Sequence, residues 1–326
     1  MGHRIFITGS NIADEARALM EQHSCIYEFG DENDSPEEIA AKLKRFKPNG
    51  LIVRKGQINS DVIQAVDSLK AICKHGVGVD NIDIEFATQH KTPVMITALA
   101  NFESVAEHTL GLMLSLLRKI PAQDKRVREG IFDKRGYFGD ELLCKTLGLV
   151  GFGRIARRLS ELVSPFRMKV MAYDPFLKPD QMRPDVTPVR ELNELLSAAD
   201  IVSIHCPLTP DTKGLIGAEA FEIMKDTAYI INTARGAVID EKALIAALEN
   251  HQISGAALDT FEKEPPELHN PLFKMDNVIV TTHVGGVSAN AFRRMGIGAV
   301  RNILSILNSE PPDMSCVLNQ EVLTQV

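Results

Sequence analysis

Three short segments of the sequence place reactive side chains directly after apolar runs. Arg235 lies in residues 232–236, several acids lie in residues 258–265, and His283 lies in residues 282–286. An arginine can clamp a carboxylate with two parallel hydrogen bonds, and a histidine exchanges a hydroxyl proton near neutral pH. A carboxylate beside the histidine stabilises its charged form. These are the groups needed to oxidise a hydroxy acid or to reduce an oxo acid.

Each of these residues also has an ordinary explanation when it is taken alone. Arg235 suits a surface charge, and His283 suits a hydrogen-bonded turn. Glu262, Glu264 and Glu267 all lie in one charged loop, so the residues leave the choice of acid open. Their shared position after successive predicted strands favours a site, because ligands of doubly wound sheets bind at the carboxyl ends of parallel strands.

A glycine turn in residues 147–156, LGLVGFGRIA, indicates a dinucleotide site. Gly151 permits the tight turn, Gly153 lets the backbone approach a pyrophosphate, and the start of the following helix supplies N–H groups for phosphate. Asp174 lies 21 residues beyond Gly153, after a second apolar run. Because an acid there accepts the ribose hydroxyls and repels a 2′-phosphate, and no arginine follows immediately, the pattern predicts NAD.

The elements that must position these residues alternate along the chain. Strands are predicted at residues 5–8, 50–53, 71–74, 93–96, 146–150, 169–173, 201–204, 228–232, 255–258 and 278–281. Helices fill the gaps, for example at residues 36–45, 60–65, 106–117, 155–163, 191–198 and 241–249. This alternation predicts an α/β fold of doubly wound parallel sheets.

The length of 326 residues favours two domains. The glycine turn lies well inside the chain, so another domain is expected to be built before it. A predicted helix at residues 288–307 follows the last strand and is expected to cross back to that first domain, which would make it discontinuous. The apolar helix at residues 104–118 suits a core helix, a link between domains or a subunit contact.

Composition narrows the class of protein further. The net charge of −7 argues against non-specific nucleic-acid binding. The five cysteines are scattered, without a C-x-x-C pair, which favours reduced thiols in the cytoplasm and no metal site. No apolar run is long enough to span a membrane, and residues 4–9 are typical of a strand and turn rather than of a signal peptide.

Several motifs in the same order resemble those of one known family. They are residues 77–83 (VGVDNID), 104–107 (SVAE), the glycine turn, 205–209 (HCPLT), 232–236 (NTARG), 255–259 and 283–286. Over roughly residues 50 to 316 the chain resembles the D-isomer-specific 2-hydroxyacid dehydrogenases, and most of all their 3-phosphoglycerate dehydrogenase branch.

The resemblance implies a fold of two doubly wound domains with the active site in the cleft between them. A flavodoxin-like substrate domain would comprise residues 1–99 and 286–326, and a Rossmann NAD-binding domain would comprise residues 100–285. It further implies a cytoplasmic enzyme that uses NAD and forms a homodimer through the NAD-binding domain.

The resemblance also implies residue roles. Arg235 would bind substrate, His283 would be the acid/base, and Glu264 would be its partner, which settles the choice among the three acids. Substrate contacts would also come from Arg54, Val77 and Gly78. Cofactor contacts would come from Gly151, Gly153, Arg154, Ile155, Asp174, Cys206, Thr233, Asp259 (toward the nicotinamide carboxamide) and Gly286. His205 is interpreted as structural, and His108 as a packing or surface residue.

The substrate expected from the resemblance is 3-phosphoglycerate or a similar small anionic hydroxy acid. Arg54 and Lys55 are placed to meet a second anion. Arg135 suits either a contact to a substrate phosphate or, with Lys134, a solvated basic cluster. A glyoxylate or hydroxypyruvate reductase is the alternative, and an NAD-sensing co-repressor is a further one. The length leaves no room for the C-terminal regulatory domains of longer phosphoglycerate dehydrogenases, so feedback by serine is not expected.

Overall fold

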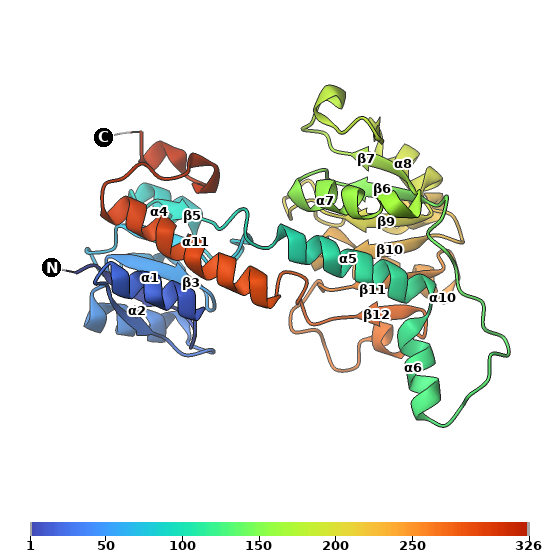
Figure 1. Cartoon of the computed structure of the whole chain (residues 1–326), viewed down its shortest axis with the longest axis horizontal. Helices are drawn as coiled ribbons and strands as arrows, with labels where there is room; N and C mark the ends of the chain where they lie inside the picture. The colour runs from blue at the N-terminus through green and yellow to red at the C-terminus, as the bar shows by residue number, and fades with distance from the viewer. Residues whose placement is uncertain (1, 325–326) are drawn as a thin grey trace. The chain divides into compact units, whose positions relative to one another are not determined.

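The computed structural model describes residues 2–324, and contacts within it divide the chain into two units. One unit comprises the residues up to Asn101 together with those from Gly286 onward, and the other comprises Phe102–Gly285. Figure 1 colours the chain along its sequence, so the first unit contains both blue and red elements. Two units, each with its own sheet and core, are thus built from one chain.

The first unit is a five-stranded parallel sheet in the order β2-β1-β3-β4-β5. Its strands are β1 (Arg4–Ile7), β2 (Ile26–Phe29), β3 (Gly50–Val53), β4 (Ala71–Lys74) and β5 (Val94–Met95). Its helices are α1 (Asp14–Gln22), α2 (Pro36–Phe46), α3 (Ser60–Ile63), α4 (Ile84–Gln89) and α11 (Ala289–Leu307). This strand order is that of flavodoxin-like doubly wound sheets.

Helix α11 completes the core of this unit from the far end of the chain. Its buried residues include Ala299, Val300 and Ile303, which pack with residues of α1, β1 and β3 in one apolar cluster. Gly50 permits this packing, because a Cβ there would lie 2.5 Å from Cγ2 of Ile303. The opposite face of the sheet is covered by α2, α3 and α4.

The second unit is a seven-stranded parallel sheet in the order β12-β11-β10-β9-β6-β7-β8. Its strands are β6 (Thr146–Val150), β7 (Lys169–Tyr173), β8 (Val186–Val189), β9 (Ile201–Ile204), β10 (Tyr229–Asn232), β11 (Gly255–Leu258) and β12 (Val278–Val280). Its helices are α5 (Phe102–Leu117), α6 (Ile120–Arg128), α7 (Arg154–Leu162), α8 (Leu192–Ala198), α9 (Ala218–Ile223) and α10 (Glu241–Glu249). Helices α5 and α7 pack on one face, and α8, α9 and α10 on the other.

The predicted α/β class with two doubly wound parallel sheets is confirmed, but two strands were missing from the prediction. Strands β2 and β8 are edge strands of their sheets. The four residues of β2 are partly exposed, and β8 carries Pro188 with buried residues only at its two ends. Strands β2 and β8 lack the continuous apolar run of a strand that is buried on both faces, so the pattern did not mark them.

Helix α5 is a core helix of the second unit. Its residues Leu112, Met113, Leu116 and Leu117 are buried in the cluster that also contains residues of β6 and α7. This placement supports the core-helix alternative for this apolar segment. Within residues 2–324, none of the helices has the length and apolar character needed to cross a membrane.

Candidate active site

The residues after β10, β11 and β12 meet at the carboxyl edge of the seven-stranded sheet. The N–H of Asp259 donates to the carbonyl of Asn232 at 2.9 Å, and the N–H of His283 donates to the carbonyl of Asp259 at 2.8 Å. The loops that carry Arg235, Glu264 and His283 therefore start from adjacent, hydrogen-bonded strand ends. This is the edge at which doubly wound sheets bind ligands.

His283 and Glu264 form a direct pair. Nδ1 of His283 lies 2.7 Å from Oε2 of Glu264, and the two side chains are 47% and 38% exposed. The other carboxylate oxygen, Oε1, accepts the N–H of Phe261 at 3.1 Å. The neighbouring acid Glu267 is paired with Lys263 at 3.2 Å. The geometry thus brings Glu264 to the histidine and holds its carboxylate in one orientation.

The pair favours its ionised form. The hydrogen bond from Glu264 raises the pKa of His283 above its ordinary value, although burial and the charge of Arg235 oppose the shift. Burial raises the pKa of Glu264, but hydrogen bonds from His283 and Phe261 outweigh burial and leave it below its ordinary value. The backbone of His283 has φ 54°, in the left-handed region that non-glycine residues adopt uncommonly.

Arg235 is presented by a tightly braced loop. The side chain of Asn232 donates to the carbonyl of Arg235 at 2.9 Å and accepts the N–H of Ala234 at 3.0 Å. A Cβ at Gly236 would lie 1.8 Å from the carbonyl carbon of Phe261, so only glycine fits there. The loop after β10 is therefore packed directly against the loop that leads to Glu264.

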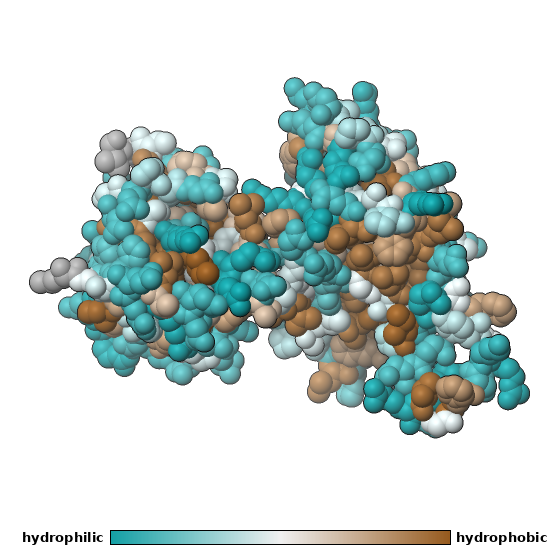
Figure 2. Space-filling view, viewed as in Figure 1, coloured by the Kyte–Doolittle hydropathy of each residue, from teal (hydrophilic) through white to brown (hydrophobic). Residues whose placement is uncertain are grey.

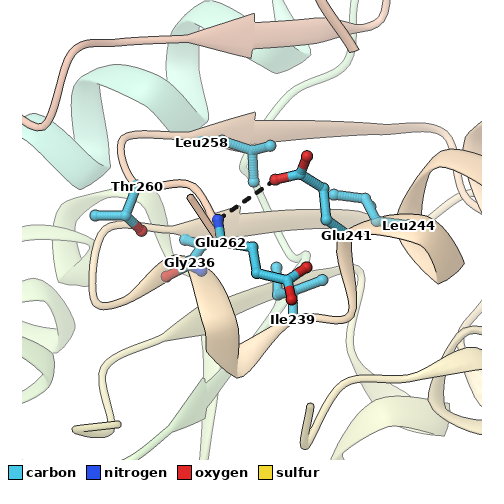
Figure 3. A pocket seen from close by; sticks show the side chains of 8 residues that line it. Gly236, Ile239, Glu241, Leu244, Leu258, Thr260 and Glu262 are labelled. Atoms are coloured by element: carbon cyan, nitrogen blue, oxygen red, sulfur yellow. Dashed lines mark hydrogen bonds between the residues drawn. The ribbon is translucent and has the colours of Figure 1, made fainter. Parts of the chain in front are cut away.

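A small cavity lies beneath these loops (Figure 3). It is lined by Asn232, Gly236, Ile239, Glu241, Leu244, Leu258, Thr260 and Glu262. Its volume of about 10 Å³ has room for about one water molecule, so it is no substrate pocket. The carboxylate of Glu241 accepts the N–H of Glu262 at 3.4 Å, the dashed line in Figure 3, and the side-chain amide of Asn270 at 2.7 Å. Glu241 thereby holds both ends of the segment around Glu264.

Asp259 is buried behind His283 and fixes the loop that follows it. Its Oδ1 accepts hydrogen bonds from the Thr281 hydroxyl and from the N–H of Val284, and its Oδ2 accepts from the N–H of Gly285. Burial raises the pKa of Asp259, but hydrogen bonds from His108, Thr281 and the two amides outweigh burial and hold it well below its ordinary value. Asp259 is therefore a buried, charged residue whose carboxylate fixes residues 281–285 by hydrogen bonds.

The glycine turn after β6 has the shape of a phosphate cradle. Gly151 has φ +87°, and a Cβ there would lie 2.8 Å from the backbone nitrogen of Cys206. Gly153 caps α7 without any side chain, and a Cβ there would meet nothing within 4 Å. By contrast, the side chain of Asp240 caps α10 by accepting two of its first N–H groups. The start of α7 thus leaves N–H groups and open space for a pyrophosphate.

Asp174 stands beside this turn at the end of β7. Its Oδ2 accepts the N–H of Phe152 at 2.9 Å, and its Oδ1 accepts the N–H of Phe176 at 3.0 Å. Each carboxylate oxygen has a second lone pair, so the side chain is oriented by the backbone and still able to accept ribose hydroxyls. The free N–H groups at the start of α7 and the carboxylate of Asp174 therefore fit NAD.

The remaining predicted cofactor residues lie at several places. Arg154 and Ile155 form the first turn of α7, and Thr233 is buried with its hydroxyl 3.0 Å from that of Thr109. Burial raises the pKa of the Cys206 thiol to about 11. Gly286 belongs to the first unit, where a Cβ would lie 2.9 Å from Nδ2 of Asn101.

The predicted substrate residues Arg54, Val77 and Gly78 follow β3 and β4 of the first unit. Arg54 donates to the carbonyl of Asn11 at 2.7 Å, and its guanidinium carbon lies 5.3 Å from the ring centre of Phe292. Burial lowers the pKa of Arg54. Val77 is 39% exposed.

The sequence predicts no metal site and leaves the role of Arg135 open. The side chain of Arg135 is 92% exposed and lies 3.9 Å from Asp133. Within residues 2–324, no group of three or more histidine, cysteine or acidic side chains is arranged to hold a metal ion.

One contact at this edge was not expected. Nε2 of His108, on α5, lies 3.1 Å from the hydroxyl of Thr281 and 3.5 Å from Oδ1 of Asp259. The sequence alone predicts His108 to be a packing or surface residue. The two partners of this hydrogen bond are 173 positions apart, so no local pattern could reveal it.

Comparison with known proteins identifies the family. The family pattern described as "D-isomer specific 2-hydroxyacid dehydrogenase, NAD binding domain" matches residues 110–285. The chain belongs to this family. The predicted membership of the D-2-hydroxyacid dehydrogenases is thereby confirmed, and the matched residues are those that contain the glycine turn and the His283–Glu264 pair.

Individual relatives agree with this family membership. The chain is 37% identical to D-3-phosphoglycerate dehydrogenase of Archaeoglobus fulgidus over 85% of its own length and 52% of the relative's. It is 39% identical to glyoxylate reductase of Thermofilum pendens over 98% of the chain and 95% of the relative. The TT0316 protein of Thermus thermophilus has a similar structure, with a TM-score of 0.89 and 32% identity, covering 97% of this chain and 99% of that one. The chain thus spans about half the length of the phosphoglycerate dehydrogenase that it matches.

Proposed function

We propose that this chain is an NAD-dependent D-2-hydroxyacid dehydrogenase that interconverts a small anionic 2-hydroxy acid and its 2-oxo acid. The observation that carries the proposal is the His283–Glu264 pair, held at 2.7 Å beside Arg235. The pair lies at the same sheet edge as the uncapped glycine turn. Acid–base chemistry and dinucleotide binding are thereby supported on one scaffold.

The residues that would hold NAD are those of the glycine turn and Asp174. Gly151 would shape the tight turn, Gly153 and the first turn of α7 would offer N–H groups to the pyrophosphate, and Asp174 would accept the ribose hydroxyls. Bound NAD supplies the hydride acceptor for oxidation or, as NADH, the hydride donor for reduction. The protein contributes position, orientation and charge.

His283 exchanges the proton of the substrate hydroxyl. Glu264 occupies Nδ1 of the ring, which leaves Nε2 as the nitrogen for proton transfer. In the direction of oxidation neutral His283 accepts the hydroxyl proton, and in reduction its imidazolium returns it. The raised pKa of His283 favours the protonated form that reduction needs. Arg235 orients the substrate carboxylate through its paired N–H groups.

We further propose a division of labour between the two parts of the chain. Residues 100–285 would bind NAD, and residues 1–99 with 286–326 would form the substrate domain. The backbone N–H groups of Val77 and Gly78 would hold the substrate carboxylate, in the manner of a main-chain nest. Arg54, whose side chain projects from the loop after β3, would bind a second anionic group of the substrate.

The proposed substrate is 3-phosphoglycerate, or 3-phosphohydroxypyruvate in the reducing direction. The cationic side chain of Arg54 and the similarity to a D-3-phosphoglycerate dehydrogenase support this choice. The deciding experiment measures NADH oxidation with 3-phosphohydroxypyruvate, hydroxypyruvate and glyoxylate. Preference for the phosphorylated acid by kcat/KM supports the proposal, and preference for either of the others contradicts it. No turnover with any of the three would contradict the enzymatic proposal itself.

Arg54 allows a matched test of the second anion. Hydroxypyruvate has the carbon skeleton of 3-phosphohydroxypyruvate without the phosphate. Arg54→Gln is expected to raise KM for the phosphorylated acid by roughly tenfold or more, because it removes a charged hydrogen-bond partner. The KM for hydroxypyruvate should change far less. Equal losses for both acids would contradict the assignment.

The proposed oligomer is a homodimer formed through the NAD-binding part. No residue of α6 is buried, and the chain after it exposes Phe132 and Phe138 at 91% and 84%. Figure 2 shows apolar side chains gathered over α5. A hollow of about 520 Å³ opens between α6 and Tyr137. An exposed apolar surface of this extent is typical of a protein interface.

A charge substitution tests the dimer. Phe132→Asp is expected to convert the dimer to monomer in sedimentation or light-scattering measurements. Leu268→Asp is the matched control, because Leu268 is also 91% exposed but lies in the loop after β11.

A cytoplasmic location is proposed because the five cysteines within residues 2–324 are free thiols. Cell fractionation tests this location.

A further inference from the structure

His108 occupies the start of a hydrogen-bond chain that ends at the loop of His283. It projects from α5, and its side chain is 25% exposed. Nε2 lies 3.1 Å from the hydroxyl of Thr281, the residue that follows β12. That hydroxyl lies 2.5 Å from Oδ1 of the buried carboxylate of Asp259. Three side chains from three separate segments are thus connected in series.

The direction of this chain follows from its proton inventory. Asp259 is ionised, because its pKa is held well below the ordinary value, so its oxygens only accept. The single hydroxyl proton of Thr281 therefore goes to Asp259. Thr281 is left to accept from His108, which must carry its proton on Nε2. Hydrogen bonds aligned in one direction polarise and strengthen one another.

Asp259 fixes the backbone at His283 and at the two residues that follow it. Its carboxylate accepts the N–H groups of Val284 at 2.9 Å and of Gly285 at 2.8 Å. Its own backbone carbonyl accepts the N–H of His283 at 2.8 Å. These contacts hold the left-handed backbone of His283, which has φ 54°. A displacement of Asp259 would therefore move the imidazole that exchanges the proton.

Gly285 packs tightly against both Asp259 and His108. A Cβ at Gly285 would lie 2.9 Å from Oδ2 of Asp259 and 3.3 Å from Cδ2 of His108. The loop after His283 is therefore pressed against both residues, with no space for a larger side chain. Ser104, one turn earlier on α5, adds a hydrogen bond at 2.9 Å from its hydroxyl to the carbonyl of Gly285. Helix α5 thus supports this loop at two points.

We propose that His108 is a positioning residue for the reaction: through Thr281 and Asp259 it holds the backbone of His283 in the orientation needed for proton transfer. This inference rests on the proposed dehydrogenase function. It assigns a chemical task to a residue of the core helix α5, which otherwise serves the packing of the sheet. A small misplacement of an acid/base residue costs rate rather than substrate affinity.

The test compares two substitutions of similar size. His108→Leu removes the donor, and His108→Gln keeps an N–H donor close to the position of Nε2. His108→Leu is expected to lower kcat by about tenfold or more, with KM for the oxo acid within about twofold. His108→Gln should restore most of kcat. Equal kcat values in wild type and His108→Leu, or no recovery in His108→Gln, would overturn the proposal.

The pH profile separates positioning from mere stability. The charged groups that act on His283 are Glu264, Arg235 and Asp259, and the charge of Asp259 helps to raise the pKa of His283. If Asp259 moves in His108→Leu, the alkaline limb of the reduction rate should shift to lower pH and return in His108→Gln. A lower melting temperature with an unmoved limb would mean that His108 only stabilises the fold.

A double-mutant cycle tests the order of the chain. Thr281→Val removes the middle link, whereas Thr281→Ser retains the hydroxyl and should lose less activity. His108→Leu combined with Thr281→Val should be little worse than Thr281→Val alone, because both break one chain. Additive losses would overturn the proposal. His283→Asn is measured in parallel: retained activity there refutes the proposed function, whereas an inactive His283→Asn with an unaffected His108→Leu refutes only the role of His108.

Discussion

Two histidines follow parallel strands of the same sheet, and their surroundings make them opposite in character. His205 comes after β9, with Nε2 2.9 Å from the hydroxyl of Ser203, and burial lowers its pKa to about 4. His283 comes after β12 and pairs with Glu264, which raises its pKa. The first is a neutral imidazole at any physiological pH. The charged form of the second is stabilised by its carboxylate partner.

The difference shows that position at a sheet edge does not by itself make a histidine reactive. Both residues follow strands of the same parallel sheet. What separates them is a carboxylate brought from another loop, and the greater exposure of His283. We therefore propose a chemical end of the edge at His283 and a cofactor end at the glycine turn, where the backbone of Cys206, the neighbour of His205, packs against Gly151.

The largest expected effect comes from removing the imidazole at the chemical end. His283→Asn should lower kcat by about 100-fold or more, in line with the contribution of general acid–base catalysis. NADH binding should persist. Because the protein lacks tryptophan, binding is followed by the fluorescence of the cofactor. His205→Asn is the control and should lower kcat only a few-fold. Equal losses in the two variants would contradict the different roles assigned to the two histidines.

The next effect concerns the partner that distinguishes the two histidines. Glu264→Gln should lower kcat by about tenfold and remove the main cause of the raised pKa of His283. Reduction needs protonated His283, so its rate falls as pH rises through that pKa, and the fall should begin at lower pH in the variant. Glu267→Gln, which alters an acid paired with Lys263, should leave the profile in place. An unshifted profile in Glu264→Gln would contradict the pairing.

A smaller and different effect is expected at the cofactor end. Asp174→Ala should raise KM for NAD by roughly tenfold, because hydrogen bonds to a charged group are lost, and should weaken discrimination against NADP. Asp174→Asn keeps an acceptor and removes the charge, so it separates the two contributions. The pH profile should not move in either variant. A wild type that already prefers NADP would refute this interpretation of Asp174.

The smallest effect is expected from Ser203→Ala, which removes the hydrogen-bond partner of His205. The loss of one buried hydrogen bond costs about 1 kcal/mol of unfolding free energy, so Tm should fall by a few degrees. The value of kcat and its pH dependence should stay unchanged. A shift in the pH profile would show that His205 titrates in the reaction after all.

The sequence predicted the buried strands well, because a strand covered on both faces is a continuous apolar run. Strands β6 and β9 have the bounds that were predicted from such runs. The edge strands β2 and β8 were missed, since partial exposure and Pro188 break that pattern. Arg235, Glu264 and His283 were placed by a rule of topology together with a family resemblance.

The rest of the site depends on contacts that no local pattern contains. Asp259 was expected to meet the cofactor, and the structure shows both of its carboxylate oxygens engaged by residues 281–285. His108 had no signal at all, because its hydrogen bond to Thr281 requires α5 to be packed against the end of β12. Periodicity reports which side of an element is buried, but not which polar atoms meet there.

The return of α11 to the first sheet has a consequence for synthesis on the ribosome. Residues 102–285 form a unit whose strands and helices are all made before α11 emerges. The first unit has its five strands early, but one face of its sheet lacks Ala299, Val300 and Ile303 until the end. Domains generally fold as units during translation. We therefore expect the second unit to fold first. Until α11 is made, the uncovered apolar face of the first sheet would need protection by chaperones.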